Sequence, residues 1–140
     1  MNHLVFLDAQ AGELEKILSG VKTMLLKEFD PAQTTEHPVN LGDNLYFLRN
    51  KDDCVMRVKA TVVRVLYSAN RLDRDLSHTL KEMQPRLQLT EDQFNYWSMK
   101  KQVLLVEFDS AQKIPVIHVA PEKIKDRSGW IALEELGLIT

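Results

Sequence analysis

A lysine and a threonine stand side by side after a short amphipathic segment, and they are the strongest candidates for chemistry in this sequence. Together with Gly20, Lys22 and Thr23 present an ammonium group and a hydroxyl that could contact a phosphate or a carbonyl oxygen. The glycine spacing of a phosphate-binding loop is absent. A lysine beside a helix C-terminus also meets the negative end of the helix dipole, so a structural or solvated Lys22 is the alternative.

Basic side chains also recur along the central part of the chain. If they share a face with Lys22 and Lys27, they form a surface that could follow a nucleic-acid backbone. The alternative is a solvated outer face, which the net charge of −2 favours. The residues concerned are Arg49, Lys51, Arg57, Lys59 and Arg64.

Aromatic residues offer a second means of holding a base, because nucleobases stack on aromatic rings. Tyr46, Tyr67 and Tyr96 are candidates for such contacts. Phe94 and Trp97 recur at helical spacing, which predicts that they pack in the core and that Tyr96 points elsewhere.

Other chemistries find little support in the sequence. Cys54 is the one cysteine, so no internal disulfide can form, and the four histidines are too scattered to suggest a metal site. We expect no metal and no cofactor. The N-terminal residues lack the pattern of a signal peptide, and no apolar run is long enough for a membrane span. These features predict a cytoplasmic protein with no membrane partner.

The elements that position these residues follow from periodicity, turn residues and caps. The alternation of apolar residues over 54–67 changes phase near Val62 and Arg64, which predicts a β-bulge in a strongly curved strand. Pro115 suggests that the strand containing it lies at an edge. The first half of the chain is predicted to contain strand 3–7, a helix capped by Asp8 and closed by Gly20, an extended segment 22–28, loop 30–42, strand 45–48, turn 50–53 and strand 54–67. The second half is predicted to contain a helix stopped by Pro85, a second helix from Thr90, and strands 103–108 and 114–119. A C-terminal helix capped by Ser128 and carrying Trp130, Leu133 and Leu136 is predicted to follow.

Two short motifs carry a resemblance to a known family. Gly20, Lys22 and Thr23, with Lys27 four residues later, resemble the ASCH signature Gly-x-Lys-Thr-x-x-x-Arg. Gly42 and Asp43 precede the strand 45–47 as a Gly-Asp turn does in that family. The resemblance covers residues 3–118. It implies an α+β fold: a PUA-like, small, mixed, mainly antiparallel β-barrel with flanking helices. We expect residues 1–119 to form this domain and 120–140 to be an extension packed on it.

The resemblance also implies a cleft that holds RNA, a modified nucleoside or a nucleotide. Some ASCH-like proteins hydrolyse acetylcytidine with a lysine, a threonine and a glutamate. The lysine matches Lys22, but the threonine position holds Leu25, and Glu82 is the candidate glutamate. The family's closing arginine is Lys27, which lacks the bidentate fork of a guanidinium group.

The sequence therefore predicts an RNA- or nucleotide-binding module. The alternatives are a hydrolase of a modified nucleoside or of RNA, for which Lys22, Thr23 and Glu82 are the catalytic candidates, and a protein-interaction domain without a nucleotide ligand. The expected ligand-binding residues are Lys22, Thr23, Lys27, Arg49, Arg57, Lys59 and Tyr46.

Overall fold

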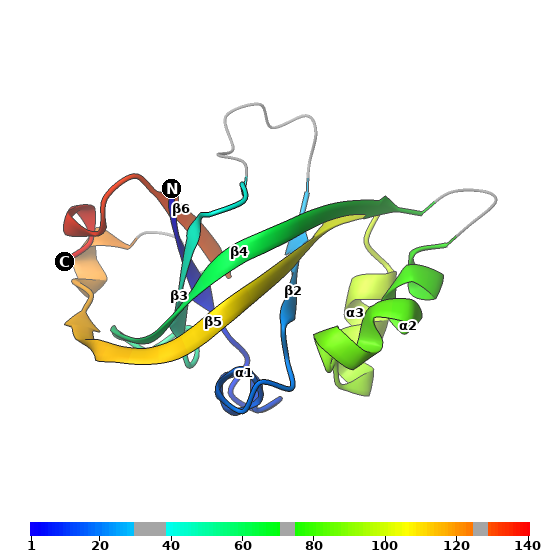
Figure 1. Cartoon of the computed structure of the whole chain (residues 1–140), viewed down its shortest axis with the longest axis horizontal. Helices are drawn as coiled ribbons and strands as arrows, with labels where there is room; N and C mark the ends of the chain where they lie inside the picture. The colour runs from blue at the N-terminus through cyan, green and yellow to red at the C-terminus, as the bar shows by residue number, and fades with distance from the viewer. Residues whose placement is uncertain (30–38, 71–74, 125–128) are drawn as a thin grey trace.

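The fold is built on one curled sheet of six strands, in the order β2-β5-β4-β3-β1-β6 (Figure 1). The computed structural model describes residues 1–29, 39–70, 75–124 and 129–140. Its elements are β1 (Asn2–Phe6), α1 (Glu13–Leu18), β2 (Met24–Glu28), β3 (Asn44–Leu48), β4 (Val55–Ala69), α2 (Leu76–Leu87), α3 (Glu91–Ser98), β5 (Gln102–His118), a 3₁₀ turn (Pro121–Lys123), β6 (Trp130–Leu133) and a second 3₁₀ turn (Leu136–Leu138).

The strand pairing is mixed but mainly antiparallel. β1 and β3 are parallel, whereas β1–β6, β2–β5, β3–β4 and β4–β5 are antiparallel. β3 and β4 form the predicted hairpin. The predicted α+β class, with a small, mixed, mainly antiparallel curled sheet and flanking helices, is confirmed.

The two long strands β4 and β5 form a ribbon that crosses the whole molecule and gives the sheet its curl (Figure 1). Their register shifts at three places, between Met56 and Val58, between Lys59 and Thr61, and between Val62 and Arg64. Such irregularities bend a strand and increase its twist. The last shift lies where the change of phase predicted a bulge, and this prediction is confirmed.

The prediction of two separate strands, 103–108 and 114–119, was wrong, because β5 continues without interruption from Gln102 to His118. Pro115 is tolerated within it for two reasons. It lies between the partners of Met56 and Val58, where the ladder is irregular. In addition, β2 pairs with β5 only through Val103–Glu107, so the second half of β5 has β4 alone as its ladder neighbour in the described sheet.

The C-terminal helix was also a wrong prediction. Trp130–Leu133 is strand β6, which adds to the free edge of β1 with Val5 opposite Trp130. The apolar spacing of this segment fits a helix, but pairing with a strand more than a hundred residues away decides its structure. The predicted cap, Ser128, lies outside the described residues.

Two helices cover one end of the sheet, α2 and α3. The helix predicted from Thr90 is present, and it begins with a capping box in which the Thr90 hydroxyl accepts from the Gln93 amide. Pro85 does not stop α2 but sits in its last turn, and the helix ends at Leu87. Phe94 and Trp97 pack against the apolar cluster beneath these helices, and Tyr96 is 56% exposed, as predicted.

The inside of the curl is filled by the principal apolar cluster. Leu14 and Ile17 of α1 pack there with Phe47 of β3 and Phe108 of β5. Gly20 follows α1, as predicted, and its φ of 83° is the left-handed conformation that glycine adopts readily at a helix end. Asp8 accepts amide hydrogens from Gln10 and Ala11 rather than capping α1 directly. The chain thus reverses at Gly20 and delivers Lys22 to the start of β2.

Candidate ligand-binding cleft

A cleft of about 1110 Å³ opens where the curled sheet fails to close. β2 forms one edge of the sheet and β6 the other. Residues 5–7 and 129–130 line the cleft on one side, and residues 25–28 line it on the other. Helices α1 and α3 contribute Glu13 and Trp97. The cleft is therefore built by segments from both ends of the chain.

Lys22 lies in the wall of this cleft and is almost completely buried, with 1% of its surface exposed. Its ammonium group donates to the Leu87 carbonyl at the end of α2 and lies 3.5 Å from the Glu13 carboxylate. The amides of Val21 and Lys22 both donate to the Lys16 carbonyl and fix the turn that brings the side chain inward. An ammonium has three donors, so one N–H remains beyond these two contacts.

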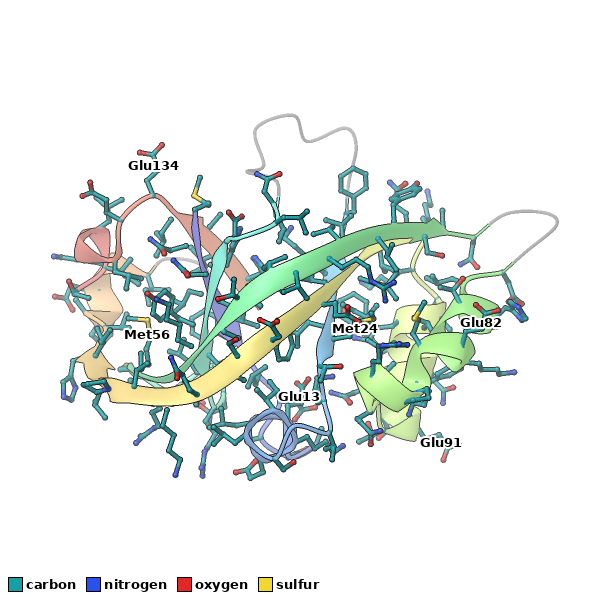
Figure 2. All side chains as sticks on the ribbon, viewed as in Figure 1. Glu13, Met24, Met56, Glu82, Glu91 and Glu134 are labelled. Atoms are coloured by element: carbon teal, nitrogen blue, oxygen red, sulfur yellow. The ribbon has the colours of Figure 1, made fainter. Side chains whose placement is uncertain are left out.

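The electrostatics of Lys22 are those of a buried cation beside one anion. Burial lowers the pKa of Lys22, and this effect exceeds the opposing effect of the Glu13 carboxylate. Figure 2 shows Glu13 on α1, close to the start of β2. The pair can offer a ligand both a hydrogen-bond donor and an acceptor.

Glu13 is a cleft residue that the sequence failed to indicate. Its partner lies nine residues later, and the contact exists because the chain turns back after α1. No spacing rule for paired functional groups covers such a reversal. The only sequence signal is the glycine at position 20, which permits the turn.

Lys27 and Leu25 line the cleft with Lys22. Lys22 precedes β2, which begins at Met24, so the two lysines do not lie on one unbroken strand. Thr23 does not line the cleft; its backbone bonds to the Arg86 carbonyl and the Phe108 amide. Leu25 is 4% exposed and belongs to the main apolar cluster, so no hydroxyl stands at that position.

Arg49 and Arg57 come together elsewhere, in a shallower pocket of about 410 Å³. This pocket shares Asn50 and Asp52 with the cleft and so adjoins it. Arg49 pairs with Glu15 at 3.3 Å, and Arg57 lies 4.0 Å from Asp53. The acidic partners of the two arginines leave this pocket with little excess positive charge.

The remaining expected site residues lie away from the cleft. Tyr46 is 7% exposed, and the Lys59 ammonium lies 5.7 Å from its ring centroid. Glu82 is exposed on α2, with its carboxylate 2.9 Å from His78 (Figure 2). The structure thus brings Lys22 and Lys27 together, places Arg49 and Arg57 in an adjoining pocket, and places Glu82 on another surface.

Both tryptophans of the chain line the cleft, Trp97 from α3 and Trp130 from β6. Tyr96 also lines it and meets Trp97 edge to face at 5.4 Å. Trp130 was missed because its segment was predicted to be a helix in a C-terminal extension packed on the domain. Two indole rings supply flat apolar surface on which a base could stack.

The charges in the cleft are mixed, with an excess of carboxylates. Three lysines line it against five acidic residues. A surface that follows a nucleic-acid backbone over many phosphates would instead carry an excess of basic groups. The cleft residues with charged side chains are Lys22, Lys27, Lys51, Asp8, Glu13, Glu28, Asp52 and Asp92.

Two further properties concern only the part of the chain that the structure describes. Within it, no three or more His, Cys, Asp or Glu residues gather in a way that could hold a metal ion. None of the helices found there is long and apolar enough to cross a membrane.

Comparison with solved structures identifies the fold. The chain superposes on the crystal structures of the ASCH protein of Zymomonas mobilis and of two of its point variants, with TM-scores of 0.68 to 0.70. The aligned parts cover 96% of this chain and 88% to 91% of the other, at 13% sequence identity. No family model and no curated protein matches the sequence. The chain has the ASCH-domain fold.

Proposed function

We propose that the cleft binds an unpaired nucleotide, either free or within an RNA strand, and that the chain is a binding module. The observation that carries this proposal is the convergence of both tryptophans with Lys22 and Lys27 on one cleft. The base would stack on indole surface, as bases do on aromatic side chains in single-strand binding proteins.

The polar edge of the base would meet the Lys22–Glu13 pair. A nucleobase edge presents donors and acceptors side by side, and this pair offers one of each. Lys27, which is only half-buried, is the group better placed to meet a phosphate. The acidic excess of the cleft limits the number of phosphates to about one or two.

The test uses the two tryptophans as reporters, because both line the cleft. Their fluorescence is recorded while nucleosides, nucleoside monophosphates and short single-stranded RNA are added at several salt concentrations. We expect saturable quenching and a salt slope no steeper than that of about two phosphates. If monophosphates and RNA bind with similar affinity, a single nucleotide is enough to fill the cleft. If RNA binds and monophosphates do not, the ligand is an RNA strand.

Replacing Lys27 with glutamine should weaken binding of phosphate-bearing ligands about 3- to 10-fold and reduce the salt slope by about one. Affinity for a nucleoside without phosphate should stay within about twofold. Lys101→Gln is the matched control, because Lys101 is an exposed lysine that does not line the cleft. If no member of the panel binds the wild type at low salt, the proposal fails and the protein-interaction alternative takes its place.

A hydrolase is the second candidate, and the buried Lys22–Glu13 pair in the cleft wall is the observation that favours it. Leu25 supplies no hydroxyl nucleophile, and Thr23 lies outside the cleft lining. We therefore expect no release of acetate from acetylcytidine above the level of a Lys22→Ala variant. Turnover clearly above that level, measured by chromatography of the products, would make the chain an enzyme.

A further inference from the structure

Behind Trp130, two buried polar side chains continue the cleft wall into the interior as a chain of hydrogen bonds. His3 of β1 is 0% exposed, and its Nε2 lies 2.8 Å from the Asp43 carboxylate. The indole N–H of Trp130 donates to His3 Nδ1 at 3.0 Å. The two rings meet edge to face with centroids 5.8 Å apart. The three residues link β1, the turn before β3, and β6.

The donors and acceptors in this chain determine the state of His3. An indole N–H can only donate, so His3 Nδ1 must be the acceptor. A carboxylate can only accept, so Nε2 must carry the proton. His3 is therefore neutral and fixed in one tautomer, with each ring nitrogen engaged.

We propose that His3 and Asp43 are positioning residues for the cleft, which hold the indole of Trp130 in the cleft wall while His3 is neutral and release it when His3 is protonated. Protonation places a hydrogen on Nδ1, so that two donors face each other and the Trp130 bond is lost. The identity of any ligand does not enter this mechanism, which can be tested in the free protein.

The groups around His3 support a neutral ring at neutral pH. Burial lowers the pKa of His3 below its ordinary value of about 6.5. Asp43 opposes this shift, while the amino group of Met1, 3.4 Å from Asp43, and the charge of Lys27 on β2 add to it. Trp130, which faces His3 from β6, carries no charge.

The hydrogen bonds of Asp43 favour its ionised form. Burial alone would raise the pKa of Asp43, but its hydrogen bonds with His3 and with the Asn40 amide outweigh burial and lower it. The pKa of His3 is lower in the folded protein than in the unfolded chain, so the unfolded chain binds the His3 proton more readily. The stabilisation that neutral His3 contributes is therefore fully present above about pH 6.5, the unfolded value. It is lost as the pH falls through the lower, folded value.

The test follows the two indole N–H signals in ¹H–¹⁵N spectra between neutral pH and about pH 4.5, a range chosen to span the ordinary histidine value. A Trp97→Phe variant assigns them. We expect the Trp130 signal to move with a midpoint below about 6.5 while the Trp97 signal stays in place. In His3→Gln, whose amide offers both N–H donors and an oxygen acceptor but cannot ionise in this range, the Trp130 signal should not titrate.

A second variant keeps the proposal testable if His3→Gln does not fold. Trp130→Phe removes the donor that favours neutral His3, so the His3 midpoint, followed by its ring carbon signal, should rise by about half a pH unit or more. The proposal is overturned if Trp130 titrates alike in wild type and His3→Gln. An immobile Trp130 signal in the wild type, or an unchanged His3 midpoint in Trp130→Phe, would overturn it equally.

Discussion

Replacing Lys22 with methionine should destabilise the protein by about 3 kcal/mol and abolish the polar contact that the cleft offers to a ligand. Methionine keeps most of the side-chain volume but removes the donor to the Leu87 carbonyl. It also removes the cation beside the Glu13 carboxylate, which is 12% exposed and still accepts from the Asp8 amide. The magnitude is at the low end for a broken buried ion pair, because Glu13 retains some contact with solvent. Urea unfolding at neutral pH measures this loss.

Lys16→Met is the matched control for this experiment. Lys16 also reaches the end of α2, where it donates to the Gln88 carbonyl at 3.1 Å, but it is only part-buried and does not line the cleft. Its replacement should cost less than about 1 kcal/mol.

Adding Glu13→Gln to Lys22→Met should recover part of the lost stability, because the carboxylate that has lost its cation is then removed. A Lys22→Met protein within about 0.5 kcal/mol of the wild type would show that the buried pair does not support the fold.

Replacing Phe47 with alanine should cost about 3 to 5 kcal/mol, an effect at least as large as that of Lys22→Met. Phe47 is 0% exposed in the middle of the curl, and its ring centroid lies 5.4 Å from that of Phe108. The curled sheet surrounds the site, so the cavity left behind can collapse only in part. Thermal and urea unfolding should both show the loss.

Val63→Ala serves as the control for the Phe47 variant, because Val63 is an exposed strand residue on β4, 41% accessible. Its replacement should change stability by no more than about 0.5 kcal/mol. Similar losses for the two variants would contradict the assignment of Phe47 to the centre of the core.

The fold could be predicted from the sequence wherever local patterns determine the structure. The change of apolar phase near Val62 predicted the bulge, and Thr90 predicted the start of α3. The C-terminal segment was not accessible in this way. Trp130 became part of a strand because β1 presents a free edge with which its segment pairs. Nothing in the pattern of residues 130–136 indicates that such an edge is available.

The candidate site was accessible only in part, for the same reason. Lys22 and Lys27 were found through a short motif, and both line the cleft. Glu13 and Trp130 were missed because the reversal after α1 and the addition of β6 bring them there. Arg57 was expected beside Lys22 on charge alone, yet it pairs with Asp53 in a neighbouring pocket.

The central claim is that the cleft between β2 and β6 is the ligand-binding site, and a chemical-shift map tests it most directly. ¹H–¹⁵N spectra are recorded while a nucleoside monophosphate, and separately a short single-stranded RNA, is added at low salt. The account predicts that both indole signals and the amides of residues 25–28 move together and saturate with one affinity. Shifts confined to the pocket around Arg49 and Arg57, or no shifts at millimolar ligand, would contradict it.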